Sequence, residues 1–168
     1  MNTKVIIREE LKSGDLGSII SLHGNLYSKE YNYDYTFEAY VGEAISQFAK
    51  RKNSRERIWI VEYKKEIVGS IAICEYTKDE AQLRWFLISP KLRGKGIGEE
   101  LISNALKFTK EKSYNIIHLW TVKGLNSAKK IYLNKSFKLV DEVTHNIWGS
   151  IHTEQKYIRK LKSYHPNS

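Results

Sequence analysis

Hydrophobic and polar positions in the first third of the chain follow two different periods. Residues 5–8 are short and β-branched, which favours a strand, and Ser13-Gly14-Asp15 then supplies turn and cap residues. Beyond them, apolar positions recur at spacings of three and four as far as residue 29, and a second segment with this spacing runs from Thr36, its expected cap, to Phe48. This part of the chain is therefore predicted to be a strand followed by two helices.

The middle of the chain is typical of strands before it becomes helical. Residues 57–63, 67–76 and 82–88 are rich in β-branched and aromatic residues and are separated by short polar segments, which indicates three antiparallel strands. Pro90 ends the third strand, a glycine-rich segment follows, and the apolar positions of 97–110 lie on one face of a helix.

The remaining segments complete an α+β pattern. Residues 116–121 favour a strand, 126–134 a helix, and 137–143 and 152–161 a closing pair of strands. We predict a mixed, mostly antiparallel central sheet of six to seven strands, flanked by about four helices and containing one βαβ crossover. Residues 1–162 are expected to form a single domain, and 163–168 a frayed tail.

Composition narrows the class of protein. A chain of 168 residues with 41% hydrophobic and 28% charged residues is typical of a globular domain. The single cysteine, Cys74, excludes an internal disulfide and a cysteine zinc site, and nothing resembles a signal peptide or membrane span, so we expect a cytoplasmic protein. The net charge of +9 favours anionic ligands, but the basic residues are dispersed and form no recognisable motif. Neither nucleic acid nor a membrane is an expected partner; a homodimer is left open.

The glycine segment Arg93-Gly94-Lys95-Gly96-Ile97-Gly98 joins a predicted strand to a predicted helix. Glycines at a helix start let a diphosphate approach several backbone N–H groups, where the helix dipole also favours negative charge. Neither the dinucleotide pattern GxGxxG nor a Walker GK[ST] sequence is present. The segment therefore predicts a phosphate site of another kind.

This run matches the R/Q-x-x-G-x-G/A signature of the GNAT superfamily of acetyl-CoA-dependent N-acetyltransferases, and residues 126–137 resemble the family's N-x-x-A-x-x-x-Y-x-x-x-G-F helix. Residues 22–31 also look like the acetyltransferase half of bacterial MarR-type regulator/GNAT fusion proteins. The resemblance implies a GNAT-like fold with a V-shaped cleft between strands 82–88 and 115–121, and acetyl-CoA as co-substrate without a metal. The implied acetyl-CoA contacts are Leu87, Ile88, Arg93, Gly94, Lys95, Gly96, Ile97, Gly98, Asn126 and Lys129.

The resemblance further implies direct transfer of an acetyl group to a primary amine of a small molecule or peptide, with Tyr132 as the catalytic acid. The general base is left open. Gln82 stands where histone-type members carry a glutamate, and Glu30, Glu75 and His145 are candidates. His145 and Trp148 are expected in the loop before the last strand. The residues expected to border the acceptor are His23, Tyr27, Glu30, Tyr31, Trp120 and His145.

Two alternatives stay open. The absence of a glutamate at Gln82 is compatible with an acyl-CoA-binding sensor that has no significant turnover, and the tyrosines of the first helix could form a packed aromatic cluster instead of a ligand site.

Ser136 replaces the family's usual glycine, so the positive-φ exit from the preceding helix is expected at Asn134.

Overall fold

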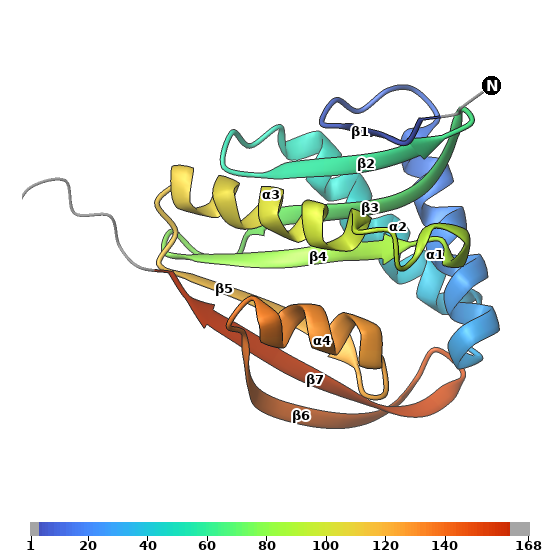
Figure 1. Cartoon of the computed structure of the whole chain (residues 1–168). Helices are drawn as coiled ribbons and strands as arrows, with labels where there is room; N and C mark the ends of the chain where they lie inside the picture. Colours follow the sequence, from blue (N-terminus) through green and yellow to red (C-terminus); the bar gives the residue numbers. More distant parts are fainter. Residues whose placement is uncertain (1–3, 162–168) are drawn as a thin grey trace, which may run out of the picture.

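A computed structural model describes residues 4–161 and shows a single mixed sheet with helices on both faces (Figure 1). The sheet has the strand order β1-β2-β3-β4-β5-β7-β6, and among the strands of this described range only the β4–β5 pair is parallel. In chain order the elements are β1 (Ile6–Arg8), α1 (Asp15–Tyr31), α2 (Tyr35–Arg51), β2 (Arg57–Tyr63), β3 (Glu66–Glu75), β4 (Glu80–Ile88), a 3-10 turn (Pro90–Leu92), α3 (Ile97–Glu111), β5 (Ile116–Val122), α4 (Asn126–Asn134), β6 (Lys138–Ile147) and β7 (Ser150–Lys160).

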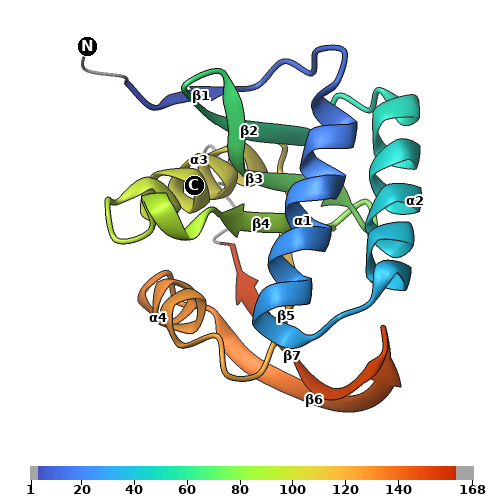
Figure 2. The same ribbon diagram turned by 90° about the vertical axis from the view of Figure 1, so that its right-hand side faces the viewer.

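The helices divide between the two faces of the sheet, α1 and α2 on one and α3 and α4 on the other (Figure 2). Two groups of buried side chains follow this division. One lies under α3 and includes Leu83, Leu101 and Leu119, and the other lies under α1 and α2 and includes Ile45 and Ile60. The predicted α+β architecture, with its seven strands, four α-helices and βαβ crossover, is therefore confirmed within residues 4–161.

Strand β4 carries a bulge where it leaves its parallel partner. The β3–β4 register passes from Ala72 opposite Arg84 to Ser70 opposite Leu87, so β4 has an extra residue there, and Trp85 has a positive φ of 48°. The buried Ser70 hydroxyl donates to the Trp85 carbonyl at 2.6 Å and fixes this irregularity.

Strands β4 and β5 separate after Gln82, just before the bulge. They pair only from Glu80 with Ile116 to Gln82 with His118, and then diverge toward the right of Figure 1. Because an unpaired strand edge exposes backbone N–H and C=O groups, the opening offers hydrogen-bonding groups to a ligand. The predicted V-shaped opening between these strands is present.

Three local predictions were wrong. Asp34, not Thr36, caps α2, because its carboxylate accepts from the Thr36 N–H at 2.9 Å. Ser136 itself takes the positive φ, 63°, after α4, a role expected of Asn134. His145 was expected in a loop with Trp148, but it lies within β6, and only Trp148 lies in the turn before β7. The predicted tail at 163–168 lies outside the described residues, and the single-domain prediction stays a prediction.

Candidate functional site

A pocket of about 590 Å³ lies between the glycine segment, α4 and the C-terminal half of α1; we call it the glycine-loop pocket. Seven of the ten residues expected to contact acetyl-CoA line it: Leu87, Ile88, Arg93, Gly94, Gly96, Gly98 and Asn126. The other three do not. Ile97 is buried in the core under α3, and the side chains of Lys95 and Lys129 lie off the pocket, where Lys130 takes the lining position.

The glycines shape this pocket in two ways. Gly94 and Gly96 have φ of 74° and 80°, and nothing lies within 4 Å of where their Cβ atoms would be, so the main chain is open to a ligand. Gly96 is the N-cap of α3 and supplies no side-chain cap, which leaves the first N–H groups of the helix available to an anion. Gly98 instead permits close packing, since a Cβ there would meet Ile131 Cδ1 at 3.1 Å. These residues fit a diphosphate.

Arg93 at the rim of the glycine-loop pocket is held by α1. Its Nη1 lies 2.8 Å from Glu30 Oε1, its Nη2 donates to Glu30 Oε2 at 3.3 Å, and its Nε donates to the Ile88 carbonyl at 3.0 Å. Glu30 and Tyr31 were expected at the acceptor, but both line the glycine-loop pocket. Glu30 therefore neutralises Arg93, which a bound phosphate would otherwise contact.

A second, smaller pocket of about 130 Å³ lies on the face of the sheet covered by α1 and α2; we call it the aromatic pocket. His23, Tyr27 and Trp120 line it, as expected. So do Gln82, Arg84 and Glu154 and the aromatic residues Tyr33, Phe37, Tyr40, Trp85 and Trp148. Tyr27 thus belongs both to a packed cluster of aromatic rings, with Tyr33 and Phe37, and to the lining of the pocket.

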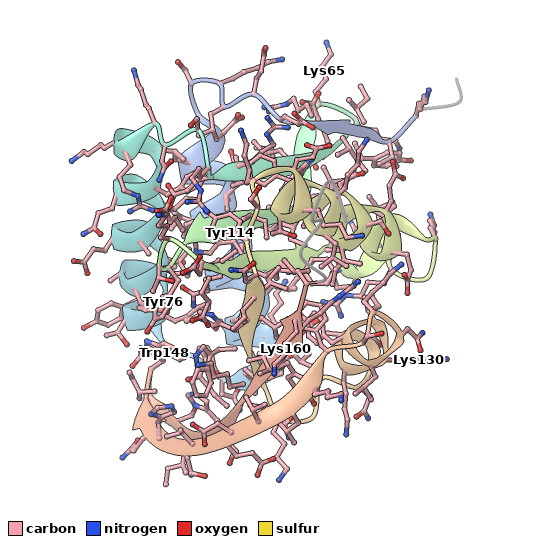
Figure 3. All side chains as sticks on the ribbon, turned by 90° about the vertical axis from the view of Figure 1, so that its left-hand side faces the viewer. Lys65, Tyr76, Tyr114, Lys130, Trp148 and Lys160 are labelled. Carbon is pink, nitrogen blue, oxygen red and sulfur yellow. The ribbon has the colours of Figure 1, made fainter. Side chains whose placement is uncertain are left out.

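The turn between β6 and β7 closes the aromatic pocket against the α1–α2 loop. The Trp148 carbonyl accepts from the Asp34 N–H at 2.8 Å, and a Cβ at Gly149 would lie 2.7 Å from the Asp34 carboxylate. The Trp148 ring, labelled in Figure 3, packs 5.0 Å from Phe37 and 5.1 Å from Tyr40, centroid to centroid. Glycine is thus required for this close approach.

The two pockets meet where β4 and β5 diverge. Tyr27, Phe86, Leu125 and Ala128 line both of them. Tyr132 lies one helical turn after Ala128 on the same face of α4, lines the aromatic pocket and is only 4% exposed. Burial raises the pKa of the Tyr132 phenol well above its ordinary value, and the neighbouring Thr121 side chain offsets this only in part. The phenol is therefore protonated, as a proton donor must be.

Backbone groups of β4 also face this junction. Ser89 N–H donates to the Val68 carbonyl of β3, whereas the Ile88 carbonyl points the other way and accepts from Arg93. Since successive N–H groups alternate between the two edges of a strand, Ile88 N–H faces the opening and Leu87 N–H faces β3. Of the two backbone donors expected to stabilise an oxyanion, Ile88 is the one placed to do so.

His23 presents an unpaired nitrogen in the aromatic pocket. Its Nδ1 lies 2.8 Å from the Ile19 carbonyl and, because a carbonyl only accepts, must donate, so Nε2 carries the lone pair and has no partner. Burial lowers the pKa of the imidazole to about 4. The ring can accept a hydrogen bond from an amine N–H, but it is a weak proton acceptor.

The other candidate general bases, Glu75, His145 and Glu30, do not line the aromatic pocket. Glu75 accepts from Asn53 at 3.1 Å, lies 3.7 Å from Arg55 and lines neither pocket. His145 does not reach either pocket directly; its Nε2 lies 3.0 Å from Glu154 Oε2, at ion-pair distance but without aligned hydrogen-bond geometry. Glu30 is paired with Arg93.

Sequence reasoning missed two charged residues of the aromatic pocket, Arg84 and Glu154. Arg84 follows Gln82 by two positions and therefore shares its face of β4, a signal that alternation could have given. Glu154 lies opposite Val122 of β5, and this pairing of distant strands has no local signature. Both residues line the pocket because the strand order places β4 and β7 on either side of β5.

Comparison with known proteins identifies the class that this fold and site define. The model of the acetyltransferase (GNAT) family matches residues 23–137, and the chain therefore belongs to that family. Among individual proteins, it is 28% identical over 106 residues to YjgM, an uncharacterized N-acetyltransferase of Escherichia coli K12, and 31% identical over 88 residues to an uncharacterized N-acetyltransferase of Chlorobaculum tepidum. These matches cover 61% and 51% of this chain and less than two thirds of each relative, 63% and 57%.

A solved N-acetyltransferase structure from Staphylococcus aureus Mu50 superposes with a TM-score of 0.77 over 95% of this chain and 99% of its own, at 18% identity. This likeness confirms the GNAT fold. The narrower resemblance to the fusion proteins with a MarR-type regulator stays a prediction.

Residues 4–161 contain no candidate for a membrane-spanning helix or for a metal site. No helix in this range combines the length and the hydropathy that a bilayer crossing needs. Nor do three or more His, Cys, Asp or Glu side chains of these residues gather where they could hold a metal ion.

Proposed function

We propose that this protein is an acetyl-CoA-dependent N-acetyltransferase that transfers an acetyl group directly to a primary amine of a small molecule or peptide. One observation carries the proposal. A pocket with an open glycine cradle and a second pocket rich in aromatic rings lie against the same pair of diverging strands and share Tyr27, Phe86, Leu125 and Ala128. A donor and an acceptor that enter separately can therefore meet there.

Each requirement of acetyl transfer has a candidate group at this junction. The thioester supplies an activated acetyl carbon. The start of α3 holds the diphosphate through backbone N–H groups, and Ile88 N–H donates to the oxygen that becomes negative during transfer. Tyr132 gives a proton to the departing thiolate, because its buried hydroxyl is protonated and lies beside the opening.

The test is thiol release from acetyl-CoA with a panel of primary amines, in wild type and in Tyr132→Phe. Loss of a general acid typically lowers the rate about 100-fold or more, and we expect this fall in kcat with CoA affinity changed less than about twofold. Tyr114→Phe is the matched control, since Tyr114 is also buried but donates to the Arg55 carbonyl away from both pockets. Full activity in Tyr132→Phe would remove the acid assignment.

The alternative is an acyl-CoA-binding sensor without significant turnover. Gln82 favours it, because this side chain lines the aromatic pocket and an amide cannot usefully accept a proton. Tight CoA binding without thiol release on a broad amine panel would support the sensor and contradict the enzyme. A cytoplasmic location stays a prediction.

A further inference from the structure

The aromatic pocket carries one charge of each sign. Glu154 enters it from β7 and Arg84 from β4, and both side chains project from the face of the sheet that α1 and α2 cover. Lys156, on the same face of β7, places its Nζ 5.9 Å from the ring centroid of Trp120, which lines the pocket. The pocket thus has an acidic part at Glu154 and a basic part at Arg84.

Arg84 has hydrogen-bonding capacity to spare. Its Nη2 donates to the Tyr40 hydroxyl at 3.1 Å, and its guanidinium lies 5.0 Å from the Trp85 ring, but no carboxylate of residues 4–161 is within ion-pair distance. A guanidinium has five N–H donors, and a planar carboxylate is its best-matched partner. Five other arginines of the described chain already have a carboxylate partner: Arg8, Arg51, Arg55, Arg57 and Arg93.

Glu154 lies near the junction of the two pockets. Burial raises the pKa of the phenol of Tyr27, a residue that both pockets share, and the charge of Glu154 adds to this shift after those of Tyr31 and Glu30. His145 lies against the other side of the carboxylate, with Nε2 at 3.0 Å from Oε2. Glu154 therefore lines the pocket while His145 contacts one of its two carboxylate oxygens.

Strand order sets a minimum separation between Arg84 and Glu154. The parallel β4–β5 pairing ends at Gln82 with His118, and continuing its register by two residues would bring Arg84 level with Trp120; Glu154 is opposite Val122, two residues farther along β5. Two strand spacings and two residues place their Cα atoms at least about 12 Å apart, and both side chains reach inward. A pocket of about 130 Å³ between them admits a slender molecule and excludes a folded surface.

We propose that the acceptor is a small zwitterionic amine, an amino acid in the broad sense, whose ammonium group binds Glu154 and whose carboxylate binds Arg84. The inference rests on the proposed acetyltransferase function and names the substrate class of that same site. A polyamine is disfavoured because its second cation would meet the positive charge of Arg84. The surrounding aromatic rings contribute attraction for the ammonium group through their faces.

Glu154 then also acts as the general base that deprotonates the bound ammonium group. It takes one proton from the ammonium group and passes it to solvent; its side chain is 21% exposed. The freed nitrogen lone pair forms the N–C bond, the C–S bond breaks, the thiolate takes a proton from Tyr132, and the second nitrogen proton restores the phenol. One proton is released for each acetyl group transferred.

The experiment compares acceptors that differ only in the carboxylate: L-lysine with 1,5-diaminopentane, 4-aminobutyrate with propylamine, and glycine with methylamine. Thiol release is measured for each with wild type, Arg84→Gln, Arg84→Lys and Glu154→Gln. Arg57→Gln is the control, since Arg57 also lies over an aromatic ring but pairs with Glu9 away from both pockets.

We expect wild type to favour the carboxylate-bearing member of at least one pair by about tenfold or more in kcat/KM. Arg84→Gln should abolish that preference, Arg84→Lys should restore part of it, and Arg57→Gln should leave it unchanged. Glu154→Gln should lower kcat at least about tenfold for both members of the preferred pair.

Amines without a carboxylate acetylated as well as or better than their partners in every pair would overturn the inference and leave the proposed function standing. A carboxylate preference that persists in Arg84→Gln, or full turnover in Glu154→Gln, would also overturn it. No thiol release with any amine would refute the proposed function itself, and this inference with it.

Discussion

Replacement of Glu30 by glutamine separates the two roles open to this residue. Glu30 was a candidate base at the acceptor, but its carboxylate lies in the glycine-loop pocket and holds Arg93 through Nη1 at 2.8 Å and Nη2 at 3.3 Å. A diphosphate bound at the start of α3 would compete with Glu30 for this guanidinium. We therefore expect Glu30→Gln to bind CoA more tightly than wild type.

The expected gain in CoA affinity is modest because the Arg93–Glu30 ion pair is partly exposed to solvent. The Arg93 side chain is 43% exposed and that of Glu30 26%, and ion pairs in water-accessible positions contribute about 1 kcal/mol or less. The substitution removes the need to break this pair and also removes a negative charge from a pocket that receives phosphates. We expect about 1 kcal/mol in total, or about a fivefold lower Kd for CoA.

Isothermal titration calorimetry with CoA measures this directly. The gain should shrink at 0.5 M salt because exposed charges are screened, and it should vanish when Arg93→Gln is already present. Glu99→Gln is the control for charge alone, since Glu99 also lines the pocket but pairs with Lys135. Weaker CoA binding by Glu30→Gln would refute the reasoning and show that Glu30 orients Arg93 for its ligand.

Two further predictions concern stability. Ser70→Ala should lower the free energy of unfolding by about 1–2 kcal/mol in urea titrations, because it leaves the buried Trp85 carbonyl at the bulge without its donor. The control is Ser103→Ala at an exposed position, which should cost less than about 0.5 kcal/mol, and equal urea midpoints for the two variants would contradict this prediction. His23 is held neutral with a pKa of about 4 against 6.5 in the unfolded chain, so stability present above pH 6.5 should be lost as the pH falls toward 4, by about 3 kcal/mol at most. His23→Gln should flatten this profile, and an unchanged slope would show that other groups cause it.

Much of the fold was predictable because its signals are local. The strand at Arg57–Tyr63 and the helix at Asn126–Asn134 have the predicted bounds, since alternation and helical spacing depend only on near neighbours. The cap of α2 was misplaced because Asp34 and Thr36 are both good cap residues, and only the chain direction after Asn32 selects Asp34. Ser136 could not be assigned because a positive φ at a non-glycine residue depends on how Phe137 packs.

Candidate residues divide in the same way. The glycines that form the cradle could be predicted from the sequence because they belong to one continuous sequence motif. Lys129 was placed toward the ligand by its motif position, but Lys130 lines the glycine-loop pocket. His145 was judged near the acceptor, and it contacts the pocket only through Glu154.

The sequence by itself determined the α+β class, the GNAT resemblance and the glycine cradle, because periodicity, turn residues and a continuous motif are properties of adjacent residues. The tertiary structure alone decided that β4 and β5 diverge at the Trp85 bulge, that two pockets meet there, and that Arg84 and Glu154 face the same space. The physical reason is strand order. Placing β7 next to β5 brings together side chains seventy positions apart, and that pairing depends on long-range packing that no local pattern specifies.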